Sequence, residues 1–207
     1  MTNTYAKQIS MRSIQDTIIQ SIRARNKGKV LFMDAFDKFG SSEAVRQAFS
    51  RLHKSGFILR ISKGIYLYPS DKENLNVSME QIAKEVAARD KARILPTGTY
   101  AQHRLGLTTQ IQTKWVYITD GTPRTLKIGG NTIKFKKGVA RNFAYKSEMV
   151  YLMVAALREM YDVPDEPINR KLKDLLKAER PEIVKHDLAL APNRIGKYLQ
   201  NLLNDAN

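Results

Sequence analysis

The spacing of hydrophobic residues near the start of the chain predicts two short helices. Isoleucine recurs every four residues from Ile14 to Ile22, which is the spacing of one helix face, and Ser13 stands where a capping residue belongs. An extended segment follows, and residues 33–39 predict a brief second helix that ends at Gly40. The pattern therefore opens with a helix, an extended segment and a second helix.

A third helix is predicted over residues 42–55, with Ser41 or Ser42 as its cap and Gly56 after its end. At the helical repeat its hydrophobic residues fall on one side. They are Val45, Ala48, Phe49 and Leu52. The opposite side is polar throughout and consists of Glu43, Arg46, Gln47, Ser50, Arg51 and Lys54. One side is thus expected to pack in a core, which leaves the other free for solvent or a partner.

A β-hairpin is predicted next, around the turn residues Lys63 and Gly64. Alternation places four hydrophobic residues on a common face, namely Leu59, Ile61, Tyr66 and Tyr68. Helix, short helix, longer helix and basic hairpin, in this order, form the winged-helix arrangement. In that arrangement the third helix enters the major groove of DNA and the hairpin, or wing, contacts phosphates.

A polar linker over residues 70–77 and a helix from Ser78 to about Asp90 follow. A second domain is expected from Arg93 onward, beginning with short helical and strand segments. From Ser147 the hydrophobic spacing predicts helices only, the first of which is hydrophobic nearly all round and therefore central.

A second hairpin is predicted within this domain, with its turn centred on Gly130 and Asn131. This register places Leu126 opposite Phe135 and Ile128 opposite Ile133. The other face then gathers three lysines, Lys127, Lys134 and Lys136. Such a face either binds an anion or is a solvated edge that charge protects from aggregation.

These elements predict an α+β protein. Residues 1–70 form a winged helix-turn-helix domain, and residues 71–92 form a linking helix. Residues 93–207 form a second domain, in which a small mixed β module (93–146) packs with C-terminal helices (147–207).

The charge of the chain favours a polyanionic partner, because the 207 residues carry a formal net charge of +15. Residues 1–70 hold 12 Lys and Arg against 4 Asp and Glu, and residues 97–146 hold 9 against a single acid, Asp120. Two separate basic modules are implied. The alternative is a generally basic cytosolic protein.

Within the first module, three side chains suit base edges, because arginine can bind guanine and glutamine adenine through paired hydrogen bonds. They are Arg46, Gln47 and Arg51. Ser50 and Lys54 suit phosphates, as do Arg60 and Lys63 on the wing. The alternatives are an ordinary solvated helix surface and a winged helix that contacts only protein.

The residue inventory argues against an enzyme. Cysteine is absent, the three histidines are far apart, and no phosphate-binding loop, nucleophile elbow or dinucleotide fingerprint occurs. Asp120 is expected to shape a turn rather than to hold Mg²⁺. No cofactor and no metal are therefore expected, and an RNA-processing enzyme or nuclease remains the rival from another class. With neither a signal peptide nor a hydrophobic run long enough for a membrane span, a cytoplasmic protein is expected.

Two runs of residues suggest a family. FGSSEAVRQAFSRLHKSGFILRISKGIYLYP, and then ILPTGTYAQHRLGLTTQIQTKWVYITDGTPRTLKIGGNTIKFKK, resemble the AbiEi-type antitoxins of type IV toxin–antitoxin systems. The likeness covers roughly residues 14–160 and is specific at GIYLYP, at PTGTYA with LGL, and at TDGTPRTLKIGG.

The resemblance implies a winged helix that represses its own operon and a second domain that counteracts a nucleotidyltransferase-like toxin. It places DNA contacts on the third helix and the wing, at Ser42, Arg46, Gln47, Ser50, Arg51, Lys54 and Lys63. It places antitoxicity on the basic second module, where the candidates are Arg124, Lys127, Lys134 and Lys136.

The partners so implied are the operator DNA, with inverted repeats as the usual site, and a toxin that is counteracted without a stable complex. The lysine face would then contact the nucleic-acid substrate or target of the toxin. A plain winged-helix regulator, whose basic second domain senses a signal or dimerises, is the alternative within the same class.

Overall fold

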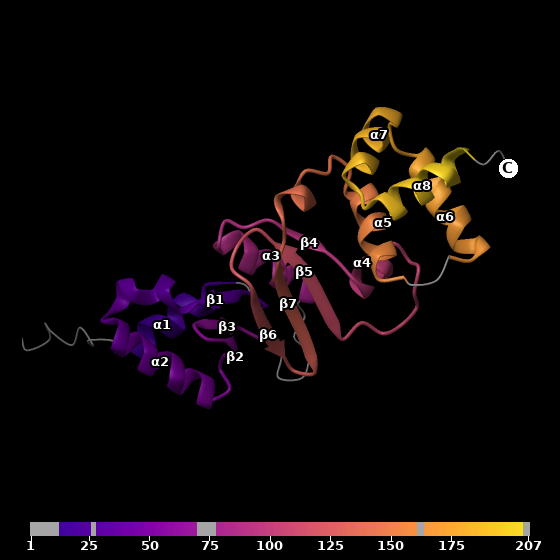
Figure 1. Cartoon of the computed structure of the whole chain (residues 1–207). Coiled ribbons are helices and arrows are strands. Elements are labelled where there is room, and N and C mark those ends of the chain that lie inside the picture. Colours follow the sequence, from indigo (N-terminus) through magenta and orange to yellow (C-terminus); the bar gives the residue numbers. More distant parts are fainter. Residues whose placement is uncertain (1–12, 26–27, 70–77, 161–163, 205–207) are drawn as a thin grey trace, which may run out of the picture. The chain divides into compact units, whose positions relative to one another are not determined.

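The computed structural model describes residues 13–25, 28–69, 78–160 and 164–204 and divides into two compact units, Met1–Ile82 and Ala83–Asn207. Both units combine helices with a small sheet (Figure 1), so the expected α+β class is confirmed at that level. The division falls within the segment 71–92 that was expected to link two domains. The linker predicted over 70–77 lies outside the described residues.

The first unit follows the element order that the hydrophobic spacing predicts. It contains α1 (Ile14–Arg23), β1 (Val30–Phe32), the 3₁₀ helix η1 (Met33–Phe39), α2 (Ser42–Lys54), β2 (Leu59–Ser62) and β3 (Ile65–Leu67). The predicted caps are present, since the hydroxyls of Ser13 and Ser41 accept hydrogen bonds from the amides of Asp16 and Ala44.

The three short strands form one antiparallel sheet in the order β1-β3-β2. The hairpin turns at Lys63 and Gly64 as expected, and Gly64 adopts a φ of 73°, which favours glycine. The predicted common face of Leu59, Ile61, Tyr66 and Tyr68 is wrong for Leu59. A bulge between Arg60 and Ser62 sets Arg60 opposite Tyr66 and Leu59 opposite Leu67, so Leu59 lies on the other face of the hairpin.

The second unit contains a four-stranded mixed sheet and the C-terminal helices. Its elements are the end of α3 (Met79–Arg89), β4 (Ile94–Pro96), α4 (Thr99–Arg104), β5 (Lys114–Thr119), β6 (Arg124–Ile128), β7 (Asn131–Lys137), the 3₁₀ helix η2 (Ala140–Phe143), α5 (Glu148–Arg158), α6 (Glu166–Lys177), α7 (Pro181–Leu190) and α8 (Asn193–Asn204). The strand order is β4-β5-β7-β6, and only β5 and β7 are parallel. None of the described helices has the length and hydrophobicity of a membrane span.

The observed register of the β6–β7 hairpin differs from the predicted one by two residues. Its turn lies at Gly129 and Gly130, so Leu126 pairs with Ile133 and Ile128 with Asn131. The φ of 58° at Gly129 favours glycine, which explains why the turn prefers the Gly-Gly pair to Gly-Asn. A shift of two residues keeps each side chain on its predicted face but changes its neighbours across the strands.

Helix α5 is the centre of the C-terminal packing, as its hydrophobic pattern predicts, with every residue from Val150 to Leu157 buried. Its start is held by Asp187 of α7, which is fully buried and accepts hydrogen bonds from the amides of Lys146 and Ser147. His186 also contacts this carboxylate, with 2.7 Å between Nδ1 and Oδ1. The carboxylate is therefore a structural cap that joins two helices.

Candidate nucleic-acid interface

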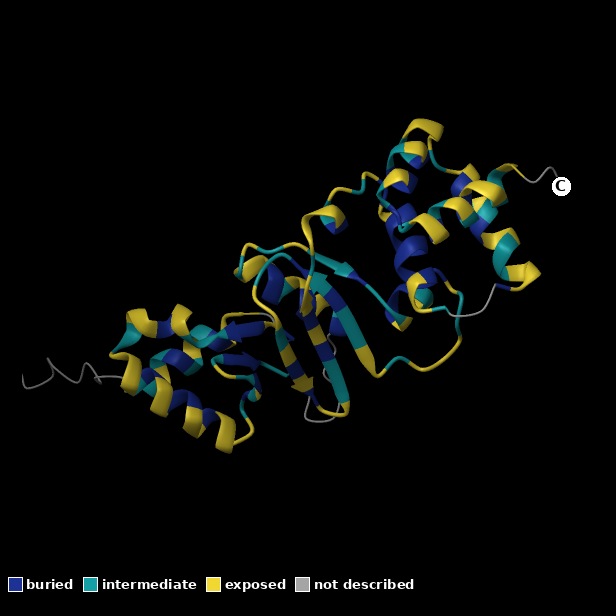
Figure 2. Cartoon of the chain, viewed as in Figure 1, coloured by how far each residue is buried: buried dark blue, intermediate teal, exposed yellow. Residues whose placement is uncertain are grey.

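All of the α2 residues that are predicted to contact DNA lie on the exposed face of the helix. Its hydrophobic face, with Val45, Phe49 and Leu52, is buried in the core of the first unit. The polar face is exposed along the whole helix, as the stripes in Figure 2 show. It comprises Ser42, Arg46, Gln47, Ser50, Arg51 and Lys54.

Aromatic packing holds α2 firmly in place. The ring of Phe49 meets the ring of Phe36 edge-on at a centroid distance of 5.1 Å and that of Tyr66 at 4.9 Å. Phe36 comes from η1 and Tyr66 from β3, so the helix is anchored to two other elements. Its exposed side chains consequently project from a rigid support.

An acid lies among these exposed side chains, in the first turn of α2. Glu43 forms a salt bridge to Arg46, with 2.8 Å between Oε2 and the nearer terminal nitrogen. Its other oxygen accepts a hydrogen bond of 3.3 Å from the side-chain amide of Gln47. The side chains of Glu43 and Arg46 remain 59% and 63% exposed, so the pair is open to solvent and of little value for stability.

The hairpin adds two cations to the first unit. Lys63 is exposed at the turn, and Arg60 is exposed on β2, where its Nε donates to the carbonyl of Ser62 at 3.4 Å. Both predicted wing residues are therefore available at the surface.

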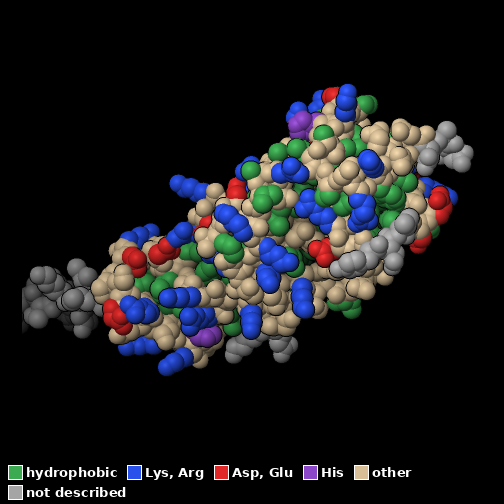
Figure 3. Space-filling model, in the orientation of Figure 1, with side chains coloured by type: hydrophobic (Ala, Val, Ile, Leu, Met, Phe, Trp, Pro, Cys, Tyr) green, Lys and Arg blue, Asp and Glu red, His purple; other side chains and the backbone are tan. Residues whose placement is uncertain are grey.

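The sheet of the second unit presents the second cationic cluster. Strand alternation puts Lys127, Lys134 and Lys136 on one exposed face, as predicted. Lys114, which the sequence analysis did not select, joins them because the parallel pairing sets it opposite Thr132. Lysine and arginine side chains gather over β6 and β7 in Figure 3. We call Lys114, Lys127, Lys134 and Lys136 the lysine face.

The observed register separates these charges. Thr132 lies between Lys114 and Lys127 in one row across the strands, and Lys134 lies beside Thr125 in the next. The predicted register would have put Lys127 directly opposite Lys134, and like charges in that position destabilise a sheet. The cluster is thus spread over three strands with no lysine directly across from another.

Only half of this side of the sheet is open. Leu95 on β4 and Ile118 on β5 share the side of the lysine face, and both pack against the hydrophobic core of the C-terminal helices. Thr125, Lys127, Lys134 and Lys136 on β6 and β7 are exposed. The helices therefore cover one half of this side, which leaves the cationic half free.

Arg124 does not belong to the lysine face, although it was expected on the antitoxin surface together with Lys127, Lys134 and Lys136. Arg124 lies on the same side of β6 as Leu126, which is the buried side. Its guanidinium forms an ion pair with Asp90. Parity along the strand decides this, because residues 124 and 127 point to opposite faces. The side chain of Arg124 is only 26% exposed, so it joins β6 to the end of α3.

Asp120 shapes the turn after β5, as predicted. Its carboxylate accepts hydrogen bonds of 2.7 Å from both the backbone amide and the Nε of Arg93. The hydrogen bonds from Arg93 lower the pKa of Asp120, so the carboxylate stays ionised at neutral pH. Asp120 therefore has a structural role.

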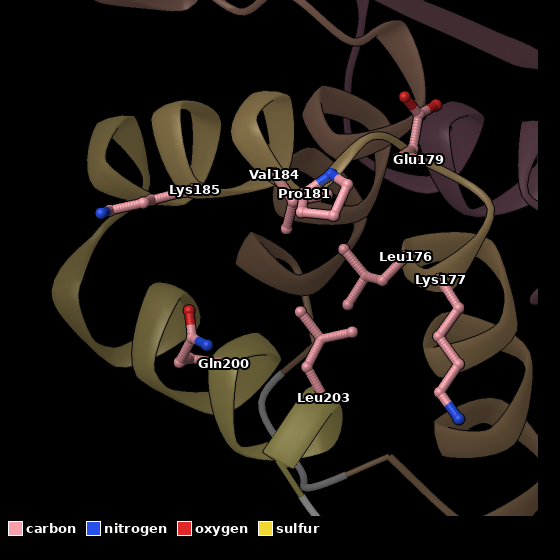
Figure 4. Close-up of a pocket in the computed structure, with 8 residues that line it drawn as sticks. All are labelled: Leu176, Lys177, Glu179, Pro181, Val184, Lys185, Gln200 and Leu203. Atoms are coloured by element: carbon pink, nitrogen blue, oxygen red, sulfur yellow. The ribbon is translucent and has the colours of Figure 1, made fainter.

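The C-terminal helices line an open pocket of about 460 Å³ between α6, α7 and α8. Leu176, Val184 and Leu203 form its hydrophobic wall, and the charged groups at its rim are Lys177, Lys185 and Glu179 (Figure 4). The pocket thus has no serine, cysteine or histidine among its lining residues.

Catalytic groupings are equally sparse elsewhere. No cluster of three or more His, Cys, Asp or Glu that could hold a metal ion occurs among the described residues. Burial raises the pKa of the phenols of Tyr145, Tyr151 and Tyr198 above the ordinary value, so they are protonated at neutral pH. The most prominent chemistry on the described surface is cationic.

Comparison with known families finds a match over most of the chain. A model described as a family of unknown function (DUF6088) matches residues 17–184, which is most of the chain. No curated protein matches the chain.

Proposed function

The chain belongs to the DUF6088 family, and we propose that this member is a DNA-binding autorepressor that also acts as an antitoxin. Its first unit is a winged helix-turn-helix in which α2 is the recognition helix and the β2–β3 hairpin is the wing. The carrying observation is the outer face of α2, where cationic and amide side chains project from a helix whose other face is anchored in a core.

Base contacts in this proposal come from Arg46, Gln47 and Arg51, because each can make the paired hydrogen bonds that distinguish one base pair from another. Ser42, Ser50 and Lys54 contact the backbone beside them. Arg60 and Lys63 on the wing neutralise phosphates and raise affinity for every sequence alike.

Binding of the DNA immediately upstream of its own gene tests this function. A gel shift should retard that duplex at a lower protein concentration than a scrambled duplex of equal length and composition. Arg170→Ala, which removes an exposed cation from α6 in the other unit, serves as the matched control and should leave both affinities unchanged. Equal affinity of the wild-type protein for the two duplexes would rule out an operator-specific repressor.

The antitoxin function is assigned to the lysine face of the second unit. Four lysines with two threonines between and beside them form a surface that suits the phosphates of a nucleic acid. In this proposal the face binds the nucleic-acid substrate or target of a nucleotidyltransferase-like toxin, and no stable complex between the two proteins is needed.

Co-expression with a nucleotidyltransferase-like toxin, sought first among the genes adjacent to that of this chain, tests the antitoxin function. Growth should be restored by the wild-type chain, and a pull-down between the two proteins should recover no complex. Growth arrest that persists at full expression would leave the plain regulator as the better description.

A nuclease remains the rival from another class, and the same preparations address it. The wild-type protein should retard RNA and DNA in Mg²⁺ without shortening them. Degradation that copurifies with the chain and is lost with a lysine-face variant would contradict the proposed function.

A further inference from the structure

Glu43 is an acid in a position where an acid is costly for a DNA-binding surface. It occupies the first turn of α2, and side chains three and four positions later share its face of the helix. Those side chains are Arg46 and Gln47, and both are bonded to its carboxylate at 2.8 and 3.3 Å. The N-terminal end of a recognition helix is the part that contacts base edges, so Glu43 would enter the groove with them.

The neighbouring phosphates make this entry unfavourable for most sequences. A carboxylate brought into the groove loses water and is repelled by the DNA backbone. Arg46 and Gln47 compensate in part, and a hydrogen-bond donor on a base can compensate further. In the major groove cytosine presents an amino donor, whereas guanine and thymine present acceptors to the incoming group. Adenine sets the acceptor N7 beside its amino group, so cytosine is the best match for a carboxylate.

We propose that Glu43 is a specificity-determining residue, which selects a cytosine in the bound site and weakens binding to sequences that lack one there. The proposal rests on the proposed function of α2.

Selection from a library of randomised duplexes tests the proposal, with the wild-type protein compared with Glu43→Gln. The glutamine keeps the length of the side chain and one acceptor oxygen, but it replaces the other oxygen with an NH2 donor and removes the charge. The wild-type protein should select a cytosine at one defined position. The variant should lose that preference, which corresponds to a change of about five- to a hundredfold in discrimination at that position.

Affinity for a scrambled duplex gives a second readout, in which Glu43→Gln should bind more tightly than the wild type because a repulsive charge is gone. Glu166→Gln is the matched control, since Glu166 is also an exposed first-turn acid that pairs with an arginine, here Arg170 of α6. It should change neither readout.

The outcomes distinguish a failure of the Glu43 proposal from a failure of the proposed function of α2. If the wild-type protein selects a sequence but Glu43→Gln selects the same one with the same discrimination, Glu43 serves only as an acid in the first turn of the helix and this inference is overturned. A lower melting temperature with an unchanged preference leads to the same conclusion. If the wild-type protein selects no sequence at all, the proposed function of α2 is itself refuted.

Discussion

The two cationic surfaces of this protein differ in what accompanies the positive charge. On α2 an acid and an amide lie among the arginines, and hydrogen bonds join Glu43 to Arg46 and Gln47. On the lysine face the neighbours of the lysines are threonines and hydrophobic residues, and the described strands carry no Asp or Glu there. The first surface offers varied hydrogen-bonding groups on one anchored helix, whereas the second offers the point charges of lysines.

That difference predicts different kinds of recognition. Sequence discrimination needs donors and acceptors arranged against base edges, and arginine supplies a planar set of donors that lysine lacks. Lysines attract phosphates without regard to sequence, and their contribution falls steeply as salt rises. We therefore expect α2 to choose among sequences, and the lysine face to bind nucleic acid of any sequence.

Charge reversal on the lysine face is the largest predicted effect. Lys127→Glu combined with Lys134→Glu should abolish toxin neutralisation in a co-expression growth assay, because the double substitution turns attraction into repulsion. Operator binding should survive. The matched control is Lys177→Glu combined with Lys185→Glu, which changes as much charge on α6 and α7, and it should neutralise the toxin like the wild type. Full protection by the lysine-face variant would contradict the assignment.

Loss of one arginine from α2 should have the next largest effect. Arg46→Ala and Arg51→Ala should each weaken binding of the operator by about 1–3 kcal/mol while changing binding to scrambled DNA much less. Titration of both duplexes by fluorescence anisotropy measures the difference. An equal loss on the two duplexes would place these arginines on the backbone and remove the contrast with the lysine face.

The wing should behave like the lysine face although it belongs to the first unit. Lys63→Ala should lower affinity for cognate and scrambled duplexes alike and reduce the slope of log affinity against log salt by about 1. A series of titrations at increasing salt gives this slope. A loss confined to the operator would mean that Lys63 contacts a base.

Substitutions at Lys114 and Arg124 test whether strand pairing, and not positive charge alone, decides which residues form the binding surface. Lys114→Ala should reduce the binding of an unstructured RNA severalfold, because it removes one phosphate contact from the lysine face. Arg124→Ala should leave RNA binding unchanged but lower the melting temperature, because it removes the closer of the two arginines that pair with the partly buried Asp90. The reverse pattern would show that the antitoxin surface lies on the other side of the sheet.

Asp120 gives the smallest effect, which depends on pH. Its pKa is below the ordinary value, so its contribution to stability is present above the unfolded-state pKa and disappears as pH falls through the folded-state pKa. Asp120→Asn should therefore lower the urea midpoint slightly at pH 7, and the difference from wild type should shrink below about pH 4. A constant difference at all pH values would mean that packing rather than charge is responsible.

Much of the fold is predictable from local pattern. The bounds of α2 and the buried set on it follow from helical periodicity and capping residues, and the exposed face of the helix follows with them. The same reasoning finds the three lysines of β6 and β7, because alternation along a strand is independent of its partner. That the exposed polar side chains of α2 bind DNA stays a prediction.

Other parts of the candidate sites depend on pairing between strands. Lys114 is 18 residues from Thr132 in sequence, and only the parallel pairing of β5 with β7 brings it to the lysine face. The ion pair of Arg124 with Asp90 spans 34 residues, and no periodicity within either segment indicates it. The bulge near Arg60 also lies beyond local pattern.

The order of residues by itself determined which side chains lie on which face of each helix and strand, since that depends on two fixed repeats. It also determined the excess of positive charge, and the caps that start α1 and α2. Tertiary structure decided which faces remain open and which charges are neighbours, because packing and strand register involve residues far apart in the chain. For that reason Arg124 is a structural residue and Lys114 a candidate for binding.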